Sequence, residues 1–221
     1  MRVHSFTFNT FAENTYVLID DATRQCAVVD PGCYTPAEQA TLRAFIVAEQ
    51  LTPTALLLTH SHIDHVLGLD FVAHTWNLTP QHHALDQETL RAVPLYAAPY
   101  GFPNLRLPET TRLLPTDGPV TFGTITLDVR FAPGHAPGHV VFYHAPTAQV
   151  LGGDVLFRGS VGRTDLPGGD LATLEASIRA QLYTLPDAVT VYPGHGPTTT
   201  IGQEKRTNPF VRAIRETGKE A

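Results

Sequence analysis

The pattern of apolar residues predicts a β-rich start to the chain. Residues 3–8 and 14–20 are rich in β-branched and aromatic types, and the turn-like segment 12–14 between them favours an opening hairpin. Gln25–Val29 predicts a third strand. Residues 54–59, TALLLT, form a short continuous apolar run, which is typical of a strand buried on both faces. The first 60 residues therefore indicate a sheet with at least one strand covered on both sides.

Helix signals separate these strands. Thr35 is suited to cap a helix, Pro36 suits its first position, and Glu38 can complete a capping box, so a helix to about Gln50 is predicted. The later part of the chain predicts further elements: strands at 124–131, 139–143, 149–151 and 189–192, a helix from about 170 to 183, and a closing helix from about 202. The length of 221 residues favours one domain spanning residues 1–221.

Residues 77–122 break the pattern of strands and helices. Seven prolines interrupt this stretch, which also carries Tyr96, Tyr100 and Phe102. It predicts a long, lid-like loop over the surface, and structured loops of this length are typically lids or binding loops. Tyr96 and Tyr100 are therefore candidate substrate-binding residues, and their rings could favour an apolar acyl chain.

Composition narrows the classes of function. The formal net charge is −6 and the isoelectric point is near 6.0, which argues against nucleic acid or an anionic membrane as partner. No apolar run approaches the roughly eighteen residues of a membrane span, and the N-terminus shows no secretion signal. Two cysteines, Cys26 and Cys33, are too few for a disulfide framework, so a reduced cytoplasm is expected. We expect a small-molecule substrate, and the sequence leaves the oligomeric state open.

The eleven histidines are clustered, and the densest cluster is in residues 59–65, THSHIDH. His60 and His62 would face the same way on a strand, whereas the neighbours Asp64 and His65 would diverge on a strand or a helix. We therefore expect a turn that brings the four side chains together after the buried strand. Three histidines and an aspartate within six residues indicate a metal site.

This segment resembles the THxHxDH metal motif of the metallo-β-lactamase superfamily. Three later segments resemble that family's remaining metal loops, in the same order: APGH at 132–135, GGDVLF at 152–157 and YPGHGP at 192–197. Within the superfamily, GDVLFRGSVGRTDLPGGD and GHGPTTTIGQEKRTNPF are most similar to short bacterial glyoxalase II-like hydrolases. The resemblance spans nearly the whole chain, from Asn14 to about Phe210.

The resemblance implies an α/β fold, a four-layer αββα sandwich in which two β-sheets lie face to face with helices outside. It implies that the first metal is held by His60, His62 and His135, that the second is held by Asp64, His65 and His195, and that Asp154 bridges them. Seven side chains exceed the needs of one tetrahedral ion, so we expect two divalent ions roughly 3.5–4 Å apart. Imidazole and carboxylate without thiolate suit zinc, with iron or manganese as alternatives.

Two such ions would activate a bridging hydroxide for attack on a carbonyl. The predicted function is a glyoxalase II-like thioester hydrolase acting on S-D-lactoylglutathione or a related acyl-thiol. Asp154, through the bridge, and Asp64, through movement of a proton, are the candidate catalytic residues.

Three other functions stay open at this point. A lactonase or other esterase would use the same hydroxide. A persulfide dioxygenase of similar fold would use one iron held by His60, His135 and Asp154. A metal-free binding module is disfavoured, because every ligand position carries a competent residue.

The resemblance makes Arg163 the candidate contact for glutathione. Larger glyoxalase II enzymes hold glutathione with a C-terminal helical domain, and we expect this chain, which ends 26 residues after His195, to lack it. We interpret Arg158, Lys205 and Arg206 as surface charges. We expect Asp165 to be paired internally.

The remaining candidates are expected to support the site or the packing. His139 in PGHAPGH and Asp30 in the Asp30–Gly32 turn are expected to support ligands rather than to bind metal. His82 and His83 are expected to contact solvent or the lid. Cys33 is interpreted as an ordinary small residue.

Overall fold

Two six-stranded sheets form the centre of the protein. The computed structural model describes residues 1–115 and 118–212. The first sheet has the strand order β1-β2-β3-β4-β5-β6, with bounds Arg2–Phe8, Glu13–Ile19, Gln25–Val29, Thr52–Leu57, Pro80–His82 and Arg112–Leu113. The second has the order β14-β13-β10-β9-β8-β7, with bounds Thr199–Thr200, Thr190–Pro193, Gln149–Gly153, Val140–His144, Ile125–Phe131 and Pro119–Phe122. A small hairpin pairs β11 (Leu156–Phe157) with β12 (Ser160–Val161).

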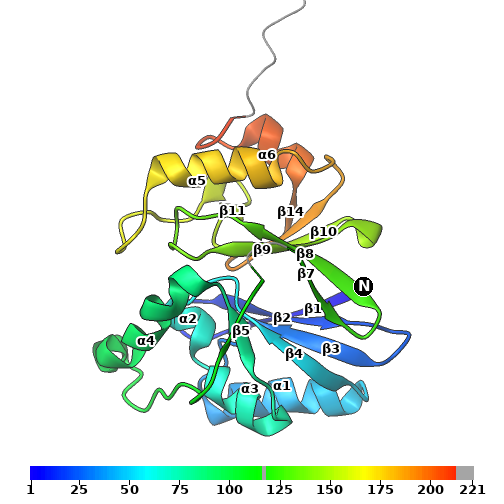
Figure 1. The fold of residues 1–221 in the computed structure, drawn as a ribbon, viewed down its shortest axis with the longest axis vertical. Helices are drawn as coiled ribbons and strands as arrows, with labels where there is room; N and C mark the ends of the chain where they lie inside the picture. Colours follow the sequence, from blue (N-terminus) through cyan, green and yellow to red (C-terminus); the bar gives the residue numbers. More distant parts are fainter. Residues whose placement is uncertain (116–117, 213–221) are drawn as a thin grey trace, which may run out of the picture.

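The sheets lie face to face, and helices cover their outer sides (Figure 1). The first sheet carries α1 (Pro36–Ala48) and α3 (Leu69–Trp76), and the second carries α5 (Leu171–Ser177) and α6 (Ile201–Thr207). This arrangement confirms the predicted four-layer αββα sandwich.

Strand β2 shows why the sheets need cover on both sides. All seven of its residues are buried. Val17 and Ile19 pack in the apolar cluster shared with α1 and α3, whereas Tyr16 and Leu18 pack in the cluster between the two sheets. Because side chains alternate across a strand, β2 contributes to two cores at once.

The predicted start of α1 is confirmed. Thr35 accepts a hydrogen bond from the Glu38 amide, and the Glu38 side chain accepts one from the Thr35 amide, which completes the capping box. The helix ends at Ala48, and Leu42 and Ile46 form its buried face.

The prediction of a loop over residues 77–122 is wrong for much of the segment. It contains β5, β6, β7 and the helix α4 (Gln87–Tyr96), which includes Pro94. A proline inside a helix removes one backbone hydrogen bond. Here Leu90 and Val93 of α4 are buried in the core, and this burial offsets the local loss.

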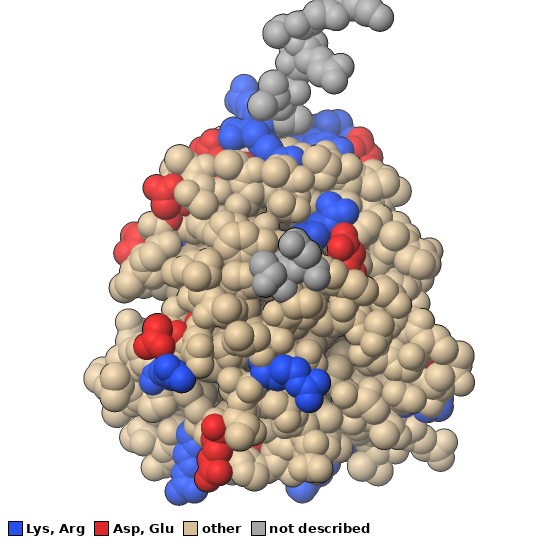
Figure 2. All heavy atoms as spheres, in the orientation of Figure 1, with Lys and Arg blue, Asp and Glu red and all other residues tan. Residues whose placement is uncertain are grey.

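Other boundaries also differ from expectation. The helix predicted at 170–183 is α5 followed by a π-helical turn, Ile178–Leu182, and α3 had not been expected. The closing helix predicted from about residue 202 is α6, which ends at Thr207; residues 213–221 lie outside the described residues. Over the described ranges, no helix is both long and apolar enough to cross a membrane. On the face drawn in Figure 2, acidic and basic side chains are interspersed with uncharged ones.

Asp20, just after β2, connects the two sheets. Its carboxylate accepts hydrogen bonds from the Thr124 amide at 2.7 Å and from the hydroxyls of Thr23 and Thr124 at 2.7 and 2.9 Å. These bonds, that from the Thr124 amide foremost, hold the pKa of Asp20 well below its usual range. The contact therefore depends on the ionised carboxylate.

We predict that Asp20→Asn destabilises the fold at pH 7 and that this difference shrinks in acid. A carboxyl whose folded pKa is depressed stabilises the fold above its unfolded pKa of about 3.9, and the contribution is lost as the pH falls through the folded pKa. Urea unfolding of both proteins between pH 7 and pH 2 measures this. Glu109→Gln, at an exposed carboxylate, is the control; a difference for Asp20→Asn that stays constant with pH would contradict the prediction.

Candidate metal centre

Three histidine rings converge at one end of the two sheets. His60 and His62 follow β4, and His135 follows β8. Nε2 of His135 lies 2.8 Å from Nδ1 of His62 and 3.2 Å from Nε2 of His60. Three ring nitrogens that point at one another cannot all be satisfied by hydrogen bonds, whereas one cation accepts all three lone pairs. This cluster therefore fits a metal ion.

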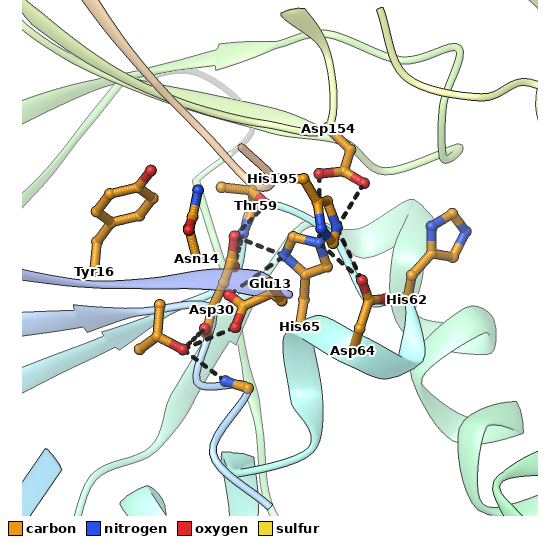
Figure 3. A network of polar contacts seen from close by, with 12 residues as sticks. Glu13, Asn14, Tyr16, Asp30, Thr59, His62, Asp64, His65, Asp154 and His195 are labelled. Carbon is orange, nitrogen blue, oxygen red and sulfur yellow. Dashed lines mark hydrogen bonds and ion pairs between the residues drawn. The ribbon is translucent and has the colours of Figure 1, made fainter. Parts of the chain in front are cut away.

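A second cluster lies beside the first. It contains Asp64 and His65, on the single-turn helix α2 (Ile63–Val66), and His195, in the loop after β13. Nε2 of His195 lies 3.0 Å from Oδ2 of Asp64, and Nε2 of His65 lies 3.6 Å from the same oxygen (Figure 3). The expectation that the neighbours 64 and 65 diverge on a helix is wrong. They are only about 100° apart on α2, so both side chains reach the centre.

Asp154 lies between the two clusters. Its Oδ2 is 3.5 Å from Nε2 of both His135 and His195, and its Oδ1 is 3.5 Å from Nε2 of His65. Oδ1 of Asp154 and Nε2 of His65 are both buried and, within residues 1–115 and 118–212, have no hydrogen-bond partner. Buried polar atoms without partners are costly, and a cation between them would satisfy both. Asp154 is thus placed to serve both clusters.

Two further side chains, His139 and Asp30, contact the groups of the two clusters. His139 accepts a hydrogen bond at its Nε2 from the Asp154 amide, at 3.0 Å, and its ring stacks on His60. Asp30 accepts hydrogen bonds from the amide and the hydroxyl of Thr59, and its Oδ2 lies 3.2 Å from Nδ1 of His65. Asp30, His60 and His65 also lie close enough to form a metal-binding group, but the Asp30 oxygens are already engaged. Asp30 and His139 thus occupy the supporting positions expected from the sequence.

The loop that carries His195 is held by the first sheet. Asn14 donates hydrogen bonds from its backbone amide to the Gly194 carbonyl and from its side chain to the carbonyls of Pro193 and Gly196. Tyr16 donates from its hydroxyl to the Pro193 carbonyl. A Cβ on Gly194 would lie 2.1 Å from Oδ1 of Asp154, so only glycine lets this loop pass so close to the centre.

Two buried carboxylates at the centre were missed by the sequence analysis. Asp86, from the segment between β5 and α4, accepts hydrogen bonds from the Ser61 amide at 2.6 Å and the Gly138 amide at 2.8 Å. It therefore connects the two loops that carry the first histidine cluster. Glu13 is fully buried, with Oε1 4.0 Å from Nδ1 of His65. Its position at the start of an otherwise apolar strand could have marked it, whereas Asp86 has no distinguishing sequence signal.

Burial and neighbouring charges shift histidine pKa values in opposite directions in the two clusters. Burial lowers the pKa of His62 to about 4 and that of His60 well below its usual range, so these imidazoles are neutral near pH 7. Burial disfavours a proton on His65 as well, but the carboxylates of Asp64 and Asp154 raise its pKa well above the usual range. A proton on His65 thus neutralises part of the negative charge of Asp64 and Asp154, which a bound metal ion would otherwise neutralise.

A cavity of about 850 Å³ opens above both clusters. The candidate ligands in its lining are His62, Asp64, His135, Asp154 and His195. The predicted substrate-binding residues Arg163, Tyr96 and Tyr100 lie in the lining as well. Helix α4 forms part of one wall, so the segment expected to be a lid lies beside the centre.

Arg163 is partnered by a neighbouring acid. Its Nε and Nη2 each lie 2.7 Å from an oxygen of Asp165, and its backbone carbonyl lies 2.7 Å from Nδ1 of His135. Both side chains of the pair are mostly exposed. Arg158 donates to the Thr198 carbonyl, and Lys205 pairs with Asp187, consistent with their interpretation as surface charges.

His4, His82 and His83 lie outside the metal centre and have packing roles. His82 is buried between the His83 carbonyl and the Thr111 hydroxyl, and the His83 ring stacks on Phe131. The expectation that this pair contacts solvent or the lid is wrong for solvent, because both residues are buried, and right for the lid, because His82 contacts Thr111 of residues 77–122. His4 stacks on Phe45.

Comparison with known proteins places the chain in a family. Residues 9–195 match the model of the metallo-beta-lactamase superfamily. A probable metallo-hydrolase, YqgX of Bacillus subtilis, is 39% identical over 91% of this chain and 93% of its own length. The hydroxyacylglutathione hydrolase GloC of Haemophilus influenzae is 34% identical over 96% of this chain and 99% of its own. A crystal structure of TTHA1623 in a di-iron-bound form has a TM-score of 0.81 and 40% identity, covering 94% of this chain and 100% of that one.

The chain therefore belongs to the metallo-β-lactamase superfamily, a family of metal-dependent hydrolases that bind divalent ions. Its histidine and aspartate clusters supply the ligand chemistry that such ions require.

We predict that Asp154→Ala loses at least one metal equivalent per chain and that His139→Ala keeps two. The first change removes the carboxylate between the clusters, whereas the second removes only an acceptor for one buried amide. The second change should still lower thermal stability, because an unpaired buried amide costs about 1–3 kcal/mol. Elemental analysis after zinc loading and dialysis measures the metal content. Loss of an equivalent from His139→Ala would show that the ligand set is assigned wrongly.

Proposed function

We propose that this protein is a dinuclear metal-dependent thioester hydrolase of glyoxalase II type, with S-D-lactoylglutathione or a related acyl-thiol as substrate. The observation that carries the proposal is the single carboxylate, Asp154, shared by two complete clusters at the floor of one cavity. In the proposed assignment His60, His62 and His135 hold one ion, and Asp64, His65 and His195 hold the other. Zinc is the expected metal, and the di-iron form of a similar structure makes iron the main alternative.

Two bound divalent ions would supply an acidic water as nucleophile and a Lewis acid for the carbonyl oxygen. The chain itself supplies rigid positioning: its ligands are fixed by buried hydrogen bonds through Asp30, His139 and Asp86. Burial raises the pKa of the Cys33 thiol to about 12, so this thiol is not a competing nucleophile. The function therefore depends on the metal ligands rather than on a nucleophilic side chain.

A thioester suits this site because a thiolate leaves without a strong general acid. Asp64, 3.0 Å from Nε2 of His195 and in the cavity lining, is the side chain we propose to move the remaining proton. The complete second cluster argues against a one-iron dioxygenase, which needs only His60, His135 and Asp154. Lactones and other esters remain chemically accessible to the same centre.

A substrate panel tests the proposal. We predict that zinc-loaded protein cleaves S-D-lactoylglutathione and a simpler acyl-thioester faster than a homoserine lactone or a β-lactam, and that glutathione persulfide causes no oxygen uptake. Thiol release, ring opening and oxygen consumption measure the three chemistries on one preparation. Faster cleavage of a lactone or a β-lactam would contradict the thioester assignment, and oxygen uptake without hydrolysis would favour the dioxygenase.

We predict that Arg163→Ala raises KM for the glutathione thioester about two- to fivefold and changes kcat less. Arg163 lies at the cavity, but its guanidinium already pairs with Asp165, and exposed ion pairs contribute only about 0.2–1 kcal/mol. Steady-state kinetics measures the split between KM and kcat. Arg158→Ala, outside the cavity lining, is the matched control; a fall in kcat at unchanged KM would contradict a binding role for Arg163.

A further inference from the structure

The walls of the cavity are mainly apolar, although its floor is the polar metal centre. Ala92, Tyr96 and Tyr100 line it from α4 and the turn that follows. Side chains from the second half of the chain face them: Phe157, Val161, Leu166 and Pro167. In Figure 1, α4 and the β11 hairpin lie in the lower and upper halves of the molecule, so the cavity is bounded by both.

The charged side chains of the wall are already paired. Apart from the candidate metal ligands, the described charged residues in the lining are Glu88 and Arg163. Glu88 pairs with Arg91 at 2.9 Å, and Arg163 pairs with Asp165. Arg163 is also largely exposed, so it lies where the charged end of a substrate can stay in water. The part of the substrate inside the cavity therefore meets apolar atoms.

These observations bear on the acyl side of the thioester and rest on the proposed function. With the reacting carbonyl at the ligands on the floor, one flank of the substrate must extend along the apolar wall. Glutathione carries carboxylates and an ammonium group, which are costly to bury without partners, so its favourable place is the open side near Arg163. The acyl group is left for the cavity, and a lactoyl group, with two carbons beyond the carbonyl and a hydroxyl, covers little of that wall.

We propose that the acyl group of the substrate occupies this cavity and that the site prefers thioesters of longer aliphatic or aromatic acids over the lactoyl thioester. Each methylene buried against an apolar wall increases binding about fourfold. Such a gain appears in kcat/KM as long as the chain fits within the cavity.

A series of glutathione thioesters tests this with the thiol held constant. We expect kcat/KM of the zinc-loaded protein to rise about fourfold per methylene from acetyl through butyryl to hexanoyl, and the phenylacetyl thioester to exceed the lactoyl thioester. A flat or falling series, or a lactoyl thioester that is cleaved fastest, would overturn the inference but leave the proposed function intact. Failure to cleave any thioester, with turnover of a lactone, would instead overturn the proposed function and this inference with it.

A matched pair of variants on α4 tests whether the cavity wall causes the gain in kcat/KM with acyl-chain length. Ala92 lies in the cavity lining, whereas Leu95, three residues on, is 85% exposed and outside it. Ala92→Asp should abolish the gain in kcat/KM with acyl-chain length, whereas Leu95→Asp should keep this gain. Thermal melting checks that both fold, and Leu166→Ser, on the opposite wall, replaces Ala92→Asp if that variant does not. Equal chain-length dependence in the lining variant and in Leu95→Asp would overturn the inference.

Discussion

The arrangement of the metal centre depends on one group, the buried carboxylate of Asp154. Its Oδ1 lies out of water with no hydrogen-bond partner among the described residues, and three histidines of the two clusters, His65, His135 and His195, lie 3.5 Å from its oxygens. A buried charge needs an opposite charge nearby, and here only protonated histidine or a metal ion can supply it. The same arrangement that makes the metal-free centre costly thus makes it a strong divalent metal site.

The sandwich holds these side chains from both of its halves. Asp30 and His65 come from the first sheet and its loops, whereas Asp154 and His195 come from the second. Hydrogen bonds from Asn14 and Tyr16 to the loop of His195 fix one half against the other. Separation of the sheets would split each cluster, because His135 and His195 come from the second half and the other cluster ligands from the first. Fold stability and metal binding are therefore expected to be coupled.

The sequence predicted the parts of the site that depend on local spacing. The histidines of residues 60–65 are close in the chain, and the apolar run before them predicted the strand that carries them. Asp86 could not be predicted, because it acts on the distant amides of Ser61 and Gly138. Glu13 could have been noticed as a charged residue in an apolar strand, but its proximity to His65 could not. Helix α4 was missed because Pro94 interrupts its sequence pattern, whereas in the fold burial of Leu90 and Val93 offsets the cost of this proline. The Arg163–Asp165 pair was predicted only in part, because Asp165 was expected to pair but its partner was not identified.

The most direct test of the account is anomalous diffraction from crystals of the zinc-loaded protein, recorded on both sides of the zinc absorption edge. The account predicts two peaks roughly 3.5–4 Å apart, one bonded to His60, His62 and His135, the other to Asp64, His65 and His195, with Asp154 in contact with both. A single peak under excess zinc, or two peaks of which Asp154 contacts only one, would contradict it.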